Sequence, residues 1–314
     1  MTPLRIVFAG TPEFGLPCLE ALHSAAHELI ALYTQPDRPA GRGQRMHYSA
    51  IKTWGLAHHL PLYQPINFKS PETVAELAAL APDLIVVIAY GLILPKSVLV
   101  IPRLGCVNVH ASLLPRWRGA SPIQQALLTG DNETGVTIMQ MDVGMDTGDC
   151  FLQSICRIES TDTSASLHQR LSVLAPEPLL RTIDALTKGE ARPVQQTEEG
   201  VTYAPKIQKQ DAAIQWDQPA SVLDRHIRGY SPWPVAYTQI DSINIRIYQA
   251  HPIEQISDHP PGTILDINPK GLLVNTGHGV LCITCLQFPG GKPITLSDYI
   301  NARRQELLVG KHLQ

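Results

Sequence analysis

Short apolar runs alternate with segments of helical periodicity along the first half of the chain. The strand-like runs and helical stretches are, in order, Arg5–Ala9, Leu16–His23, Leu29–Thr34, Pro71–Leu80 and Leu84–Ala89. The stretch Leu84–Ile88 is apolar throughout and rich in β-branched residues, which is typical of a strand covered on both faces. Strands that alternate with helices indicate βαβ units, so an α/β domain with a parallel sheet is predicted.

The same kind of order continues to residue 188 and is then lost. We predict a short helix at Ser121–Gly130, strands at Gly135–Met141 and Cys150–Ile158, and a helix at Thr163–Lys188. Pro176 and Pro178 must kink or interrupt the last helix, because proline clashes with the preceding turn. From 189 to 210 the periodicity gives way to Gly, Pro, Gln, Thr and Glu, which indicates a linker.

Beyond the linker, short strand-like runs are separated by turn residues. They lie at Val235–Ile240, Ile243–Tyr248, Gly262–Ile267, Leu272–Asn275 and Val280–Leu286, and a helix follows from Leu296 or Ser297. This strand count favours a small β-barrel of the OB-like kind. The predicted organisation is a Rossmann-like parallel-sheet domain at 1–189, a linker at 190–208 and an OB-like C-terminal domain at 209–314.

Composition and charge narrow the class of protein. The hydrophobic content of 44% is ordinary for a globular chain, and no apolar run approaches the roughly 20 residues that span a bilayer. The first apolar run, Ile6–Ala9, stops at Gly10-Thr11-Pro12 and is too short for a signal peptide, so we expect a cytoplasmic protein. A net charge of −3 gives no global attraction to nucleic acid, so any RNA contact must depend on local basic patches.

The six cysteines are spread thinly through the chain and do not resemble a disulfide framework. Cys282 and Cys285 match the C-x-x-C pattern, but they lie in a strand-like run where residues three apart face opposite ways. We therefore expect reduced cysteines, and neither a redox pair nor a metal site.

Two polar residues emerge from a buried strand in the segment Gly105–Pro115. Asn108 and His110 lie two residues apart and share a face, whereas Val107 and Val109 point the other way. Ligands bind at the carboxyl ends of strands in open α/β sheets, so this position suits a catalytic pair. The alternative is that both are buried polar residues satisfied by backbone groups.

A second candidate segment, Asp142–Asp149, follows the strand at 135–141. Its glycines permit a tight loop, and its carboxylates could reach a neighbouring strand end. A histidine that acts as a general acid or base is usually oriented by a carboxylate. Asp142, Asp146 and Asp149 meet this requirement equally well, and spacing alone does not choose among them.

The chain resembles the 10-formyltetrahydrofolate-dependent formyltransferase family. The resemblance rests on Asn108-Val109-His110 with Ser112-Leu113-Leu114-Pro115, Arg118-Gly119, Ala120-Ser121-Pro122, Gly135-Val136-Thr137 and Met145-Asp146-Thr147-Gly148. It extends nearly end to end, through Arg5–Phe14, Pro36–Gly43, Tyr203–Ile207 and Pro232-Trp233-Pro234, and is strongest to family members that act on methionyl-tRNA.

The resemblance implies a fold, a reaction and a set of site residues. The catalytic residues would be Asn108, His110 and Asp146, and the folate site would be lined by Ser112, Leu113, Leu114 and Pro115. The enzyme would transfer a formyl group from 10-formyltetrahydrofolate to the free amino group of methionyl initiator tRNA. This chemistry requires no metal, and we expect a monomer.

A basic loop is the candidate tRNA contact. It carries Arg38, Arg42 and Arg45, and from the sequence Gly41 and Gly43 are expected to make it mobile. By itself this pattern is typical of a solvated loop. The resemblance implies that the loop enters the acceptor-stem end of the tRNA, with Arg42 as the main contact. Lys206 of the linker is a further candidate, because it could form part of a local basic stripe. Gln44 and His47 stand where family members often carry lysines.

Several alternatives remain at this point. A dinucleotide-binding oxidoreductase is disfavoured because Gly10–Gly15 lacks G-x-G-x-x-G. A glycinamide ribonucleotide formyltransferase would need only the first domain. An amino-sugar nucleotide formyltransferase could carry the same catalytic trio, and a hydrolase could release the formyl group to water. A non-enzymatic RNA-binding protein would leave Asn108 and His110 unexplained.

Overall fold

The structure of the chain is a computed structural model that describes residues 3–40 and 45–314. The chain divides into two compact units. The first comprises Met1–Pro122, Glu133–Arg157 and His168–Ala204, and the second comprises Ile123–Asn132, Ile158–Leu167 and Pro205–Gln314. The domain limits predicted from composition stay a prediction.

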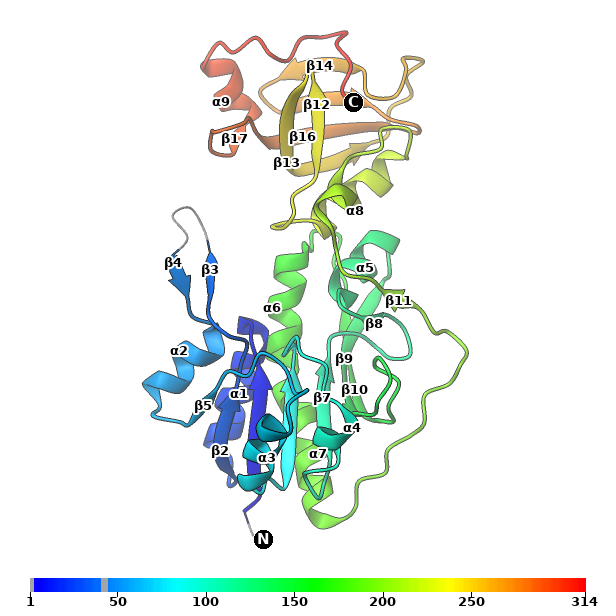
Figure 1. Cartoon of the computed structure of the whole chain (residues 1–314). Helices are drawn as coiled ribbons and strands as arrows, with labels where there is room; N and C mark the ends of the chain where they lie inside the picture. Colours follow the sequence, from blue (N-terminus) through cyan, green and yellow to red (C-terminus); the bar gives the residue numbers. More distant parts are fainter. Residues whose placement is uncertain (1–2, 41–44) are drawn as a thin grey trace. The chain divides into compact units, whose positions relative to one another are not determined.

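The first unit is built on a seven-stranded sheet (Figure 1) in the order β10-β9-β7-β6-β1-β2-β5. The strands are β1 Arg5–Gly10, β2 Glu28–Tyr33, β5 Leu62–Tyr63, β6 Leu84–Ile88, β7 Cys106–His110, β9 Glu133–Gln140 and β10 Cys150–Arg157. Five strands are parallel, whereas β9 and β10 join antiparallel at one edge. The predicted parallel α/β sheet is thus confirmed, with a reversed edge.

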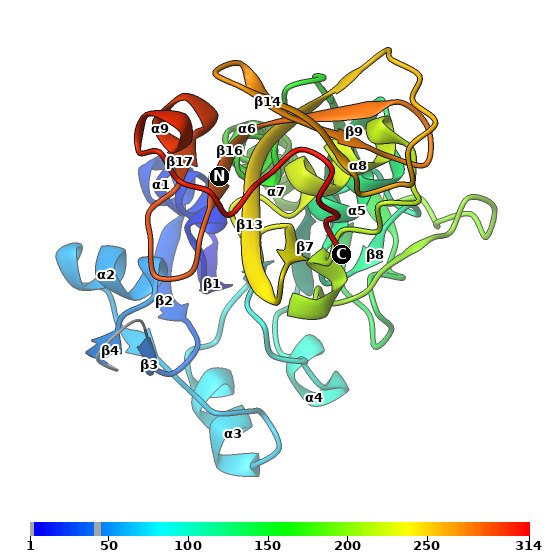
Figure 2. The same ribbon diagram turned by 90° about the horizontal axis from the view of Figure 1, so that it is seen from above.

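Helices cover both faces of this sheet. Figures 1 and 2 show α1 and α7 on one face and α3 and α4 on the other. The helices of the first unit are α1 Leu16–Ser24, α2 Ala50–Ala57, α3 Pro71–Ala79, α4 Lys96–Leu99 and α7 Pro176–Lys188. The helix α5 Pro122–Thr129 belongs to the second unit from Ile123 onward, and α6 Ser164–Leu174 is divided between the two units after Leu167. The long predicted helix is interrupted before Pro176, and α7 ends at Gly189, whose φ of 69° is the left-handed cap that glycine favours.

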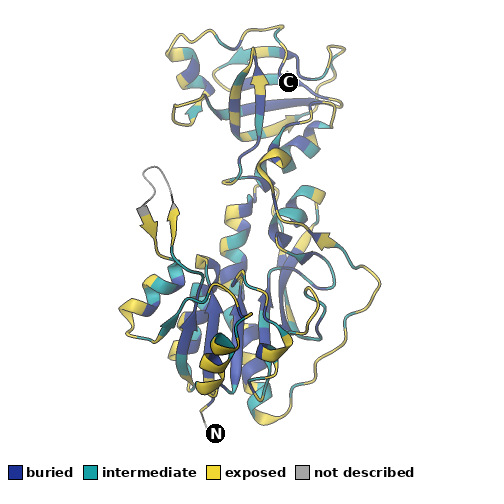
Figure 3. Ribbon diagram, in the orientation of Figure 1, coloured by how far each residue is buried: buried dark blue, intermediate teal, exposed yellow. Residues whose placement is uncertain are grey.

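The core of the sheet explains where a site can form. All five residues of β6 are buried, as the apolar run predicts, and β1 is buried from Ile6 onward (Figure 3). Because β1, β6 and β7 are adjacent and parallel, their carboxyl ends meet at one edge of the sheet. Polar residues that follow these strands therefore gather at that edge.

Two smaller pairings complete the first unit. The short strands β8 Arg118–Gly119 and β11 Tyr203–Ala204 pair in parallel. The strands β3 Arg38–Ala40 and β4 Arg45–His47 pair antiparallel and project beside α2 (Figures 1 and 2). The basic segment predicted as a loop is therefore flanked by a short pair of strands.

The second unit contains a six-stranded antiparallel sheet. Its strands are β12 Tyr237–Ile240, β13 Ile243–Ile253, β14 Ile264–Asn268, β15 Gly271–Asn275, β16 Val280–Gln287 and β17 Ile294–Thr295. Two helices, α8 Ala220–Gly229 and α9 Leu296–Asn301, accompany it. The predicted OB-like C-terminal β domain is confirmed as an antiparallel half-barrel, and α9 begins at Leu296 as predicted, but α8 was not predicted. Its buried Ala220, Leu223 and Ile227 have the helical spacing that could have revealed it.

All six cysteines are free, and burial raises the pKa of the Cys18 and Cys106 thiols to about 12, which makes them unreactive. No helix among the described residues has the length and apolar character that crossing a membrane demands.

Asp83 immediately precedes β6, and its carboxylate binds Arg5, the first residue of β1, and Arg103, which lies shortly before β7. These contacts depend on the ionised carboxylate and therefore on pH. The Asp83 carboxylate accepts from the Arg5 backbone N–H at 2.8 Å and lies 2.5 Å from Arg103 Nε. The Arg5 hydrogen bond and then the Arg103 guanidinium hold the pKa of Asp83 below its usual value. Because the folded pKa is the lower one, this stabilisation is complete above the unfolded pKa of about 3.9 and is lost as the pH falls through the folded value.

We expect Asp83→Asn to lower the free energy of unfolding at pH 7 by about 1 kcal/mol. The loss should shrink as the pH approaches 3, where the wild-type carboxyl is protonated. Urea unfolding at both pH values measures this, with the exposed Asp184→Asn as the control. An equal loss at both pH values would contradict the assignment.

Candidate active site

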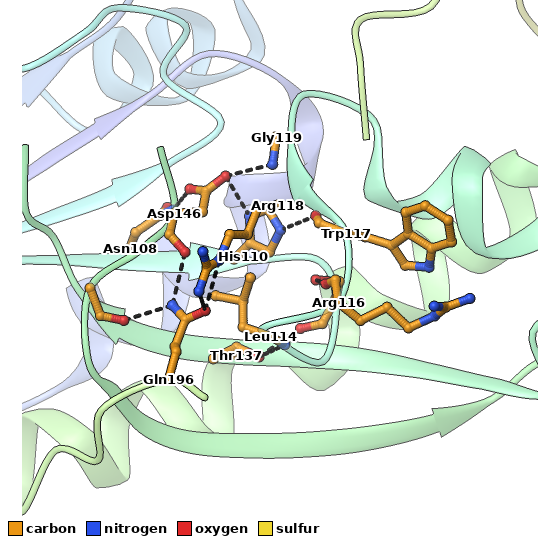
Figure 4. Close-up of polar contacts among 12 residues, drawn as sticks. Asn108, His110, Leu114, Arg116, Trp117, Arg118, Gly119, Thr137, Asp146 and Gln196 are labelled. Atoms are coloured by element: carbon orange, nitrogen blue, oxygen red, sulfur yellow. Dashed lines mark hydrogen bonds and ion pairs between the residues drawn. The ribbon is translucent and has the colours of Figure 1, made fainter. Parts of the chain in front are cut away.

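The three side chains singled out by the sequence meet at the edge where β7 ends (Figure 4). Asn108 and His110 project from the same face of β7, and Asp146 comes from the loop after β9. Asn108 Nδ2 donates to Asp146 Oδ1 over 3.5 Å, and His110 Nδ1 lies 3.7 Å from Asp146 Oδ2. The structure therefore groups all three residues within the first unit.

The His110 ring is held in one orientation. Its side chain is only 6% exposed, and Nε2 lies 2.9 Å from the carbonyl oxygen of Trp117. A carbonyl can only accept, so Nε2 carries a hydrogen and donates it. Nδ1 is then the nitrogen that faces the Asp146 carboxylate and the open side of the site.

The Asp146 carboxylate is held from two sides. The Gly119 backbone N–H donates to Oδ2 at 2.8 Å, opposite Asn108. Gly119 has a φ of 121°, and a Cβ there would lie 2.6 Å from the Ala204 carbonyl oxygen, so only glycine fits. Asp142, by contrast, binds the Gly144 N–H and the Thr147 hydroxyl of its own loop. Asp142 therefore serves the loop, whereas Asp146 faces the strand.

The segment predicted to bind folate is anchored by hydrogen bonds. The buried Ser112 hydroxyl donates to the Arg116 carbonyl at 2.6 Å, and Thr137 Oγ1 accepts from the Leu114 N–H at 3.1 Å. Ser112 and Leu114 thus hold the loop, and the peptide before Pro115 is cis. Leu113 and Pro115 stay partly exposed and are the members of the segment that can touch a ligand.

The predicted tRNA contacts are described only in part. Arg38 is exposed and its guanidinium donates to Gln35 Oε1 at 3.0 Å. Arg42 lies outside the described residues, and Arg45 is placed only as the first residue of β4. Lys206 is exposed and belongs to the second unit. The roles of these four residues stay predictions.

Sequence reasoning missed the groups that support the trio. Trp117 offers its carbonyl to His110, Gly119 offers its N–H to Asp146, and Gln196 contacts the loop that bears Asp146. Arg118-Gly119 belongs to the family motif, so the resemblance could have indicated that Gly119 contributes to the site. Gln196 lies in a segment of linker composition, and no local pattern marks it.

Within 3–40 and 45–314, no three His, Cys, Asp or Glu side chains form a metal-binding group.

Two family models match the chain and together cover most of it. Residues 4–183 match the family described as formyl transferase, and residues 206–304 match the formyl transferase C-terminal domain. The fold and the edge-of-sheet site thus define a formyl-transferring enzyme.

Relatives narrow the class further. The chain is 54% identical over 314 residues, all of both chains, to a methionyl-tRNA formyltransferase of Legionella pneumophila. It is 48% identical to one of Pseudoalteromonas translucida, over 96% of this chain and 94% of that one. The chain therefore belongs to the formyl transferase family, among the methionyl-tRNA formyltransferases.

A solved structure shares the fold at low identity. HypX of Aquifex aeolicus, in complex with tetrahydrofolic acid, superposes with a TM-score of 0.65 and 16% identity, over 100% of this chain and 51% of that chain.

Proposed function

We propose that this enzyme transfers the formyl group of 10-formyltetrahydrofolate to the amino group of methionyl initiator tRNA in the cytoplasm. The full-length similarity to methionyl-tRNA formyltransferases supports the acceptor. The observation that carries the chemistry is the convergence of Asn108, His110 and Asp146 at the carboxyl end of β7. The alternative acceptors, an amino-sugar nucleotide or water, have no comparable support.

A folate donor fits the family and the residues beside the trio. The segment Ser112–Pro115 follows β7 directly and presents Leu113 and Pro115, partly exposed apolar side chains suited to an aromatic ring system. A neighbour with the same fold binds tetrahydrofolic acid. We propose that this segment lines the folate site and places N10 of the donor near His110.

During the reaction, negative charge develops on the formyl oxygen, and we place this oxygen within reach of the hydrogen-bond donors of Asn108 and His110. The uncharged amine attacks the formyl carbon, and charge develops on the formyl oxygen in a tetrahedral intermediate. Asn108 Nδ2 and a protonated His110 Nδ1 donate to that oxygen, because both point to the Asp146 side of the site. The amine loses a proton and N10 gains one, and Asp146 with a bound water relays it. The C–N bond to N10 then breaks and tetrahydrofolate leaves.

The acceptor tRNA is proposed to contact Arg38, Arg42, Arg45 and Lys206. Arginine and lysine bind phosphates without reading bases, so these contacts add affinity and little sequence information. The β3–β4 strands hold Arg38 and Arg45 at the two sides of the segment that carries Arg42.

Arg42→Ala is expected to raise the KM for methionyl-tRNA on the order of 10–100-fold, because a charge-assisted hydrogen bond contributes about 1.5–3 kcal/mol. The turnover number and the KM for the folate should change little. Steady-state kinetics at low salt measures this, and Arg181→Ala removes an exposed cation on α7 as a control. A fall in turnover at unchanged KM would instead place Arg42 near the reacting atoms.

An acceptor panel tests the proposed function. The enzyme is given 10-formyltetrahydrofolate with a labelled formyl group and equal concentrations of methionyl initiator tRNA and a dTDP-linked amino sugar. We expect acid-stable label on the tRNA alone. Label on the sugar nucleotide, or label released as formate, would overturn the acceptor and retain the trio.

A further inference from the structure

Gln196 occupies an unusual position in the connecting segment after α7. Its side-chain amide makes four hydrogen bonds, two as donor and two as acceptor, which is its full capacity. The mechanism above does not use Gln196. Its neighbour Gln195 is exposed and makes no comparable contact among those resolved.

The donor half of Gln196 holds the loop that carries Asp146. Nε2 donates to the carbonyl oxygens of Asp146 at 2.8 Å and Gly148 at 2.7 Å. Asp146 has a φ of 55°, a left-handed conformation that L-residues adopt at a cost, least for Asn and Asp. These two hydrogen bonds, one to Asp146 itself and one to the residue two positions later, favour the turn that directs its carboxylate toward Asn108 and His110 (Figure 4).

The acceptor half of Gln196 is oriented by a buried cation. Arg118 is 4% exposed, and its Nε and one terminal nitrogen donate to Gln196 Oε1 at 3.0 and 2.8 Å. This bidentate contact selects the amide orientation in which Nε2 faces the loop, because a flipped amide would set two donors against each other. Gly119, next to Arg118, donates to the Asp146 carboxylate. The short strand β8 therefore holds the Asp146 carboxylate directly, through the Gly119 N–H, and the Asp146 backbone indirectly, through Arg118 and Gln196.

The connecting segment also supports His110. The Trp117 N–H donates to Thr202 Oγ1 at 2.9 Å, and the Trp117 carbonyl accepts from His110. Tyr203 and Ala204 pair with β8. The segment 194–204 thus contacts Trp117, which binds His110, and the loop that carries Asp146.

We propose that Gln196 is a positioning residue for Asp146. The inference rests on the proposed role of Asp146. It assigns to Gln196 no contact with substrate. Its removal should lower the turnover number and leave the KM of donor and acceptor within about twofold, because the loop geometry changes while the binding surfaces remain.

Three variants test this role. Gln196→Ala removes all four hydrogen bonds, whereas Gln196→Glu keeps the Arg118 contact as an ion pair but cannot donate to the two carbonyls. We expect both to lower the turnover number on the order of 10–100-fold. The exposed neighbour variant Gln195→Ala should match the wild type. Full activity of Gln196→Glu would overturn the donor role.

A double-mutant cycle separates positioning from general destabilisation. The acceptor is first identified with the wild-type enzyme, so that a failure of the proposed acceptor is detected there. The rate at which the folate loses its labelled formyl group is then measured for all variants with that same acceptor. In the Asp146→Asn background, Gln196→Ala should cost less than threefold, because its target is already impaired. An undiminished cost in that background would overturn the inference.

Discussion

His110→Ala is expected to slow formyl transfer on the order of 10³-fold, the larger of the effects that follow from the site. The substitution removes the Nδ1 donor beside Asp146 and the hydrogen bond between Nε2 and the Trp117 carbonyl. Single-turnover transfer at saturating substrate isolates the chemical step. The KM values should change little, since the buried ring offers only its Nδ1 edge to the site.

The control for this variant is His251→Ala, an exposed histidine of β13. It should retain the wild-type rate. Thermal unfolding of both variants reports whether the loss reflects unfolded enzyme. A folded His110→Ala enzyme with more than a tenth of the wild-type rate would show that His110 is not the donor.

Asp146→Asn is expected to lower the rate on the order of 10²–10³-fold with little loss of stability. Asparagine tolerates the left-handed φ of 55° and can still accept from the Gly119 N–H. It lacks the negative charge beside His110 Nδ1 and cannot relay a proton.

Asp142→Asn is the matched control in the same loop. Asp142 binds its own loop at Gly144 and Thr147, so asparagine there should keep the rate within a few-fold of the wild type. If Asp142→Asn were the slower variant, the choice of carboxylate would be wrong.

Much of the fold was predictable because its signals are local. The apolar run of β6 and the alternation in β7 gave a buried strand and a polar pair on one face, and the structure confirms both. Pro176 marked the break between α6 and α7. The reversed edge of the sheet was not predicted, because an apolar strand reads the same in parallel and antiparallel pairing.

The site was predictable only in part. Spacing located Asn108 and His110 but left three carboxylates equivalent, and only the family resemblance chose Asp146. The structure places Asp146 against Asn108 and His110, whereas Asp142 binds groups of its own loop. Gln196 could not be found from local pattern, because its contacts with Asp146 and Arg118 span 50 and 78 residues. The residues around Gln196 face solvent and have the composition of a linker, so composition gave no indication that Gln196 points inward.

The most direct test is single-turnover transfer of labelled formyl from 10-formyltetrahydrofolate to methionyl initiator tRNA, by the wild type and by Asn108→Ala. We predict acid-stable label on the methionyl amino group with the wild type. Asn108→Ala should be slower on the order of 10²–10³-fold, since it lacks one of the two donors to the formyl oxygen. A wild type that leaves the tRNA unlabelled, or an Asn108→Ala enzyme with an unchanged rate, would contradict the account.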